Sequence, residues 1–133
     1  MTTQISGDTG VSQVQDNTVT SAKIVDAAIV QADLATAVLP IGVGQTWQDV
    51  KTTPGRVNGT TYTNSTGRSI ELGIVVSGAA QNSIVTLTVG GIVVAQYQSY
   101  AATSQGALKA TVPNGVTYAV TGASVIQSWA ELR

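Results

Sequence analysis

Apolar residues recur at every second position through much of residues 45–132, and glycine or asparagine interrupts the pattern at short intervals. In one such run, Val85, Leu87 and Val89 fall on the same side of the chain. Because successive side chains of a strand point to opposite faces, a period of two predicts strands with one buried face. This part of the chain is therefore expected to fold by pairing short strands.

The alternating runs predict eight strands, at residues 45–50, 56–63, 68–76, 85–89, 92–97, 108–112, 116–120 and 124–132. Gly90-Gly91 is a two-residue hairpin sequence between two of the runs. Pro113-Asn114-Gly115 predicts a tight turn between two others. Eight short strands separated by such turns are typical of an all-β sandwich of jelly-roll type.

The chain changes character near Pro40, because every Trp and Tyr lies after it and none before it. A shift of this kind marks a domain boundary. We expect an N-terminal arm over residues 1–40 and a β-sandwich head over residues 41–133.

The arm contains a ten-residue repeat in which Asp16 aligns with Asp26 and Val19 aligns with Ile29. So short a repeat cannot bury its apolar positions within one chain, and copies of the same arm around a symmetry axis are the simplest partners. We expect a homotrimer in which the arm also anchors the protein. The apolar positions that need partners are Val14, Val19, Ile24, Ile29 and Leu34.

Three structures of the arm remain open. The repeat and its Thr and Val residues favour an extended, intertwined arm with short helical turns. The alanine content and the heptad-like spacing over residues 21–38 favour a three-helix coiled coil. A tail that orders only on its docking site is the third. We favour the extended, partly helical form.

The residue types exclude several functions. The chain has no Cys and no His, which removes disulfides, thiolate nucleophiles, Cys/His zinc sites and Ser-His-Asp triads. Six basic residues without a basic run disfavour nucleic-acid binding. No apolar run approaches the roughly 18 residues of a membrane helix, and residues 1–20 lack the pattern of a signal peptide.

The remaining catalytic candidates are weak. Asp49 and Glu71 are the only acids between Pro40 and Glu131, and a glycosidase pair made of them is one interpretation. A strand residue that faces solvent is the favoured one for Glu71, which alternates with apolar neighbours. Gly42-Val43-Gly44 lacks the third glycine and the flanking elements of a dinucleotide site. We expect no enzyme and no cofactor.

The aspartates of the arm offer one further ligand hypothesis. In a trimer they would form rings with room for a cation. Turn or helix-cap roles are the favoured interpretation, so no metal is expected. The residues concerned are Asp8, Asp16, Asp26 and Asp33.

The aromatic residues divide into core and surface candidates. The chain has no Phe, so Trp47 and Trp129 are expected to be the large core side chains. Trp129 would also pin the last strand. Tyr97 and Tyr100, close to the loop at residues 99–106, are the candidates for contact with a glycan.

Three segments of the head resemble the C-terminal domain of bacteriophage tail-fibre and head-fibre proteins: Ile41-Gly-Val-Gly-Gln-Thr-Trp-Gln-Asp-Val50, Gly59-Thr-Thr-Tyr-Thr-Asn-Ser-Thr-Gly-Arg68 and Trp129-Ala-Glu-Leu-Arg133. The arm is similar to the Val-Thr-Ser-Ala-Lys-Ile repeats of phage fibres. Many such proteins have longer shafts, whereas about forty residues precede the head here. This favours a short fibre or a capsid decoration.

The resemblance implies a homotrimer on the virion surface, made in the bacterial cytoplasm. The arm would bind phage capsid or tail proteins, and the head would project. The alternative is a receptor-binding tail-fibre tip that recognises bacterial surface polysaccharide. The resemblance carries over no catalytic residue.

Overall fold

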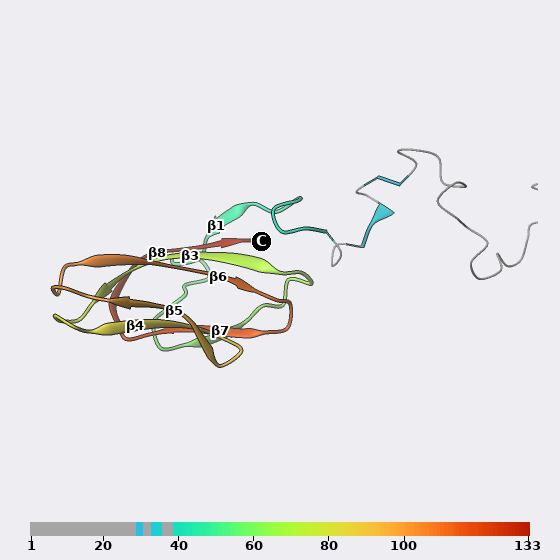
Figure 1. Ribbon diagram of the computed structural model, residues 1–133. Coiled ribbons are helices and arrows are strands. Elements are labelled where there is room, and N and C mark those ends of the chain that lie inside the picture. The colour runs from blue at the N-terminus through green and yellow to red at the C-terminus, as the bar shows by residue number, and fades with distance from the viewer. Residues whose placement is uncertain (1–28, 31–32, 36–38) are drawn as a thin grey trace, which may run out of the picture. The chain divides into compact units, whose positions relative to one another are not determined.

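The head is built from eight strands, and Figure 1 shows their arrangement in two layers. The computed structural model describes residues 29–30, 33–35 and 39–133. The predicted anchoring residues Val14, Val19 and Ile24 lie outside these residues. In chain order the strands are β1 (Trp47–Asp49), β2 (Thr61–Thr63), β3 (Ile70–Gly78), β4 (Ile84–Val89), β5 (Ile92–Gln98), β6 (Gln105–Val112), β7 (Thr117–Thr121) and β8 (Ala123–Leu132).

The strands form two four-stranded sheets in which every pairing is antiparallel. One sheet has the order β1-β8-β3-β6 and the other the order β2-β7-β4-β5. Each predicted run overlaps one observed strand, so the all-β prediction with eight strands is confirmed. The run at residues 56–63 is the least accurate. Its first half is a loop, in which the backbone nitrogen of Arg56 donates to the oxygen of Val50.

The inner faces of the two sheets enclose the core. Strand β3 shows the alternation most clearly, with Ile70, Leu72 and Ile74 buried and the residues between them partly exposed. Trp129 on β8 is fully buried, which confirms its predicted place in the core. A Trp side chain buries about 150–250 Å², so this residue accounts for a large share of the apolar contact on the central strand β8.

Trp47 is not a core residue, and this prediction is wrong. Its side chain is 54% exposed. Strand β1 is the outer strand of its sheet, and Trp47 stands opposite Leu132 on the outer face. The indole lies over Gly73 of β3, where a Cβ atom would come within 3.6 Å of the ring. The ring is therefore in van der Waals range of Gly73 on the outside of the sheet.

The two predicted turns are confirmed. Gly90 and Gly91 both have positive φ, of 60° and 81°, between β4 and β5. A two-residue hairpin turn of type I′ requires positive φ at both positions, which glycine adopts without strain. Gly115 also has a positive φ, of 78°, in the turn after Pro113.

Residues 40–45 are attached to the head by hydrogen bonds. Arg68 Nη2 donates to the oxygen of Pro40 over 2.8 Å. The buried Gln45 side chain donates to the oxygens of Ser69 and Leu132, which ties the entry of β1 to both neighbouring segments. The chain from Ala35 onward forms one compact unit.

Candidate functional site

A buried carboxylate, Glu131, is the centre of the most developed polar cluster in the head. Alternation along β8 turns Glu131 to the same side as Trp129, and its side chain is fully buried. A buried ion is costly unless it is paired and hydrogen-bonded. The surroundings of Glu131 therefore have to supply partners for both of its oxygens.

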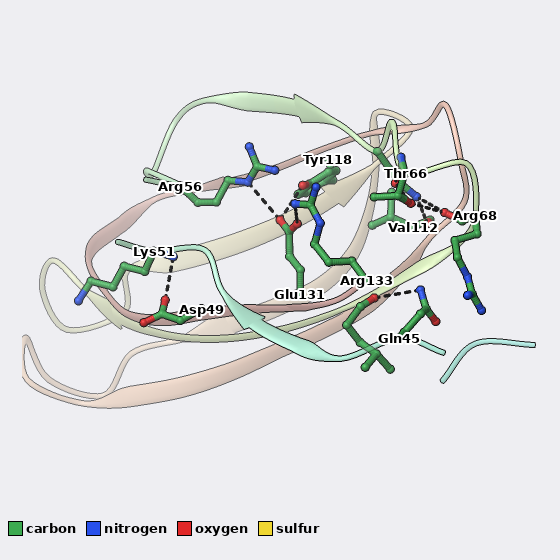
Figure 2. A network of polar contacts seen from close by, with 12 residues as sticks. Gln45, Asp49, Lys51, Arg56, Thr66, Arg68, Val112, Tyr118, Glu131 and Arg133 are labelled. Carbon is green, nitrogen blue, oxygen red and sulfur yellow. Dashed lines mark hydrogen bonds and ion pairs between the residues drawn. The ribbon is translucent and has the colours of Figure 1, made fainter. Parts of the chain in front are cut away.

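Three side chains provide those partners, as Figure 2 shows. Tyr118 of β7 donates its hydroxyl hydrogen to Oε1 over 2.6 Å. Arg56, from the loop after β1, donates Nε–H to the same oxygen over 3.1 Å. Arg133 Nη1 lies 2.9 Å from Oε2. The carboxylate thus joins three separate segments of the chain in one network: the β1–β2 loop, β7 and the end of β8 with Arg133.

An aromatic cluster supports the Arg56 guanidinium. Its central carbon lies 4.2 Å from the centre of the Tyr62 ring and 5.8 Å from that of Tyr118. The Tyr62 ring meets Trp129 edge to face, with centres 5.9 Å apart. Cations are attracted to the faces of such rings. The Tyr62 ring packs against the guanidinium, and Glu131 accepts a hydrogen bond from its Nε.

The environment of Tyr118 keeps its hydroxyl protonated. Burial raises the pKa of Tyr118 well above its ordinary value, and the hydrogen bond to Glu131 raises it further. The phenol is therefore a permanent donor to the carboxylate at physiological pH.

The chemistry of the cluster is that of a structural network. In the described part of the chain, Glu131 is the only acidic side chain that lines the small pocket beside it. A glycosidase requires two. Oε1 accepts two hydrogen bonds and Oε2 accepts one, so both oxygens of Glu131 are engaged within the protein.

A second network closes the loop between β2 and β3. The buried Asn64 donates to the oxygens of Arg68 and Val112 over 2.8 and 2.9 Å. Its Oδ1 accepts hydrogen bonds from the nitrogen and the hydroxyl of Thr66. An Asn side chain that hydrogen-bonds to nearby backbone groups in this way stabilises a turn. This hydrogen-bonded loop forms one wall of the pocket beside Glu131.

Asp49 and Glu71, the two acids considered as a glycosidase pair, do not belong to the Glu131 cluster. Glu71 on β3 is partly exposed, as expected for an outward strand residue, and stands opposite Leu132. Asp49 ends β1 on the same sheet, and its Oδ1 accepts the backbone N–H of Lys51 over 2.9 Å. No hydrogen bond joins the two acids, whose side chains both lie in the described part of the chain.

The glycan-contact candidates occupy different environments. Tyr100 is 83% exposed. Tyr97 is half-buried, packs against the core and covers Gly106 of β6, where any Cβ atom would overlap its ring. Tyr100 is therefore accessible to solvent, whereas the Tyr97 ring packs over Gly106 of β6.

Few of the arm residues are described. Ile29 and Leu34 are 55% and 44% exposed. Asp33 accepts the backbone N–H of Val30 over 2.9 Å, the local turn role favoured for it. The aspartates at positions 8, 16 and 26 lie outside the described residues.

Sequence reasoning missed Glu131. It is an acid at an inward position of an alternating strand, two residues after a buried Trp, and that pattern was the available indication.

Over residues 29–30, 33–35 and 39–133, no group of three acidic, Cys or His side chains is arranged to hold a metal ion. The same residues include no helix of the length and apolarity needed to cross a membrane. No protein-family model, curated protein or solved structure matches the chain.

Proposed function

We propose that this chain is a structural protein of a tailed-bacteriophage virion, a short homotrimeric fibre or capsid decoration. The arm, residues 1–40, anchors the trimer on capsid or tail proteins, and the head projects from the particle surface. The protein works without catalysis.

The strand order of the head is the observation that carries the proposal. Strands pair as β1 with β8, β2 with β7, β3 with β6 and β4 with β5, which is one long antiparallel ribbon rolled into two sheets. We infer a jelly roll, an architecture used by viral capsid proteins and lectins. Because a fold alone does not determine function, the ten-residue repeat of the arm is the second support.

The chemistry of the head agrees with a structural role. Its most developed polar cluster satisfies a buried carboxylate with three donors and lacks a second acid beside it. A fully hydrogen-bonded buried network of this kind favours one arrangement of the segments that meet in it.

The mass in solution and the location on particles test the proposal. A trimer has three times the monomer mass of 13.5 kDa in light scattering. Purified particles should carry density for the head at a fixed surface position in cryo-electron microscopy. A monomer at micromolar concentration contradicts the trimer, and particles without this density contradict the virion role.

Receptor binding is the second candidate, and Trp47 favours it. Trp47 is 54% exposed, and Cζ3 and Cη2 of its indole lie beside Gly73, so solvent reaches the ring. Flat exposed aromatic rings stack on sugar rings. If the head recognises surface polysaccharide in this way, Trp47→Ala should abolish cell adsorption and leave the melting temperature nearly unchanged. Unchanged adsorption contradicts this role of Trp47.

A further inference from the structure

The hairpin of β4 and β5 exposes large apolar side chains next to one another. Ile92, Val93 and Val94 follow each other in β5 and are 69%, 50% and 48% exposed. Single exposed apolar residues are ordinary on a protein surface, whereas contiguous ones mark an interaction site. These three residues are called the hairpin patch below.

The hairpin patch lies on the least protected of the four outer strands. An outer strand exposes unpaired backbone groups, and proteins commonly protect such strands by shortness, charge or proline. Strands β1 and β2 have three residues each, and β6 carries Lys109. Strand β5 has seven residues, and neither a charge nor a proline is among them. This edge of the head is therefore suited to contact with another chain.

A bulge at Val94 determines the kind of contact. Leu87 pairs with Ala95 and Thr88 pairs with Val93, so Val94 has no partner on β4. A bulge interrupts the hydrogen-bonded ladder and twists an outer strand away from further pairing. We therefore expect the hairpin patch to meet its partner through side chains and not by the addition of a strand.

The charge pattern favours a second copy of the same chain as the partner. None of the strands β2, β7, β4 and β5 contains a charged residue, and residues 72–108 are uncharged throughout. Near a symmetry axis each residue meets its own copies, so a charge there repels itself. The uncharged hairpin patch avoids this repulsion. The exposed Val57 and Val125, by contrast, line a groove together with Lys51 and Arg56.

The hairpin patch lies at the end of the head that the chain enters from the arm. Gly90, in the hairpin turn, donates its N–H to the oxygen of Thr117 over 2.8 Å. The turn before Thr117 is bound to the β2–β3 loop through Asn114. The same loop binds the oxygen of Pro40, the last residue of the arm. Arms that associate therefore bring this end of each head close to the others.

We propose that the hairpin patches of three copies pack against one another around the axis of the trimer. This contact rests on the homotrimer proposed above. The arms supply the main association, and the hairpin patches form a second contact that holds the three heads side by side. Removal of their apolar surface from water stabilises the assembly.

Cysteine cross-linking of the full-length protein tests the contact, because the chain has no Cys of its own. A disulfide requires Cβ atoms about 3.5–4.5 Å apart. At least one of the variants Ile92→Cys, Val93→Cys and Val94→Cys should therefore form covalent dimers on oxidation. Three thiols around one axis make only one disulfide, so the yield should stop at about two-thirds of the chains. Val125→Cys, which is 48% exposed on β8, is the control and should not cross-link.

Light scattering of the same variants separates this contact from the trimer itself. A trimer without a cross-link at any of the three positions overturns the contact and leaves the homotrimer standing, with the hairpin patch facing a different partner. A monomer overturns both. Cross-linking of nearly all chains indicates pairs around a twofold axis and overturns the threefold arrangement. Equal cross-linking of Val125→Cys would mean random collision and would also overturn the contact.

Val93→Lys, with Val125→Lys as its control, gives a second measurement. Three ammonium groups close to one axis repel one another. The protein concentration at which half of the trimer has dissociated should rise at least about tenfold in Val93→Lys and should stay the same in Val125→Lys. An unchanged midpoint in Val93→Lys, or an equal rise in the two variants, overturns the contact.

Discussion

Glu131→Gln tests whether the buried network stabilises the head. The change keeps the size of the side chain and removes its charge. One oxygen of Gln can still accept from Tyr118 and Arg56, which meet at Oε1 in the native protein. The new amide group then faces Arg133 Nη1, so a donor meets a donor where the native distance to Oε2 is 2.9 Å.

The structure gives the size of the expected effect. Hydrogen bonds to charged groups contribute about 1.5–3 kcal/mol and neutral ones about 0.5–1.5 kcal/mol. The hydrogen bonds from Tyr118 and Arg56 each become weaker by about 1 kcal/mol when the acceptor is neutral, and the loss of the hydrogen bond from Arg133 costs about 2 kcal/mol. The easier burial of a neutral amide offsets part of this. We expect a loss of about 3 kcal/mol, which lowers Tm by roughly 10–20 °C in a domain of this size.

Urea unfolding followed by tryptophan fluorescence measures the loss, because Trp129 is fully buried and reports on the core. All variants are compared at one protein concentration, since association shifts apparent stability. Glu71→Gln is the control. It makes the same chemical change on β3 at a partly exposed position outside the two ion pairs found among the described residues.

The result that refutes this reasoning is a Glu131→Gln variant within about 0.5 kcal/mol of the wild type, the range of ordinary surface changes. Equal losses in the two variants would also refute it, because the effect would then follow net charge and not the buried network.

Three further predictions follow from the same structure. Trp129→Ala should cost about 3–5 kcal/mol in the free energy of unfolding, and an unchanged urea midpoint would refute its core role. Folding raises the pKa of Tyr118, so the stability that its protonated hydroxyl contributes is fully present below the unfolded pKa of about 10 and is lost as the pH rises above that value. The free energy of unfolding of Tyr118→Phe should therefore fall less between pH 9 and pH 11 than that of the wild type. The double change Ile24→Asp and Ile29→Asp should abolish the trimer in light scattering while the circular dichroism of the head stays the same; a trimer of normal mass would show that the arm does not drive association.

The eight strands could be predicted because each one follows a local rule. Ile70, Leu72 and Ile74 alternate on β3, and Gly90-Gly91 has the positive φ angles of a two-residue type I′ hairpin turn. Such features depend on neighbours in sequence, so the sequence displays them directly, with the run at residues 56–63 the least accurate of the eight.

The features that could not be predicted depend on residues far apart in the chain. Trp47 lies outside because β1 pairs with the end of β8 in a register that sets it opposite the outward-facing Leu132, and its indole contacts Gly73 two strands away. Glu131 is tolerated in the core because Arg56 and Tyr118 reach it from other segments. Residue type alone predicts that a Trp is buried and a Glu is exposed. It cannot predict the distant partners that allow the opposite arrangement here.

The position of β8 between β1 and β3 has a consequence for synthesis on the ribosome. It is the last of the eight strands to be made, yet it forms the join between the outermost strand of its sheet and the rest. Gln45 donates a hydrogen bond to Leu132, 87 positions later in the chain. Until that segment leaves the exit tunnel, β1 has no neighbour and β3 exposes one edge, so the nascent head is vulnerable to aggregation. Stalled translation within the last ten codons of β8 should therefore direct the product to chaperones or proteases, whereas the released chain can close the sheet.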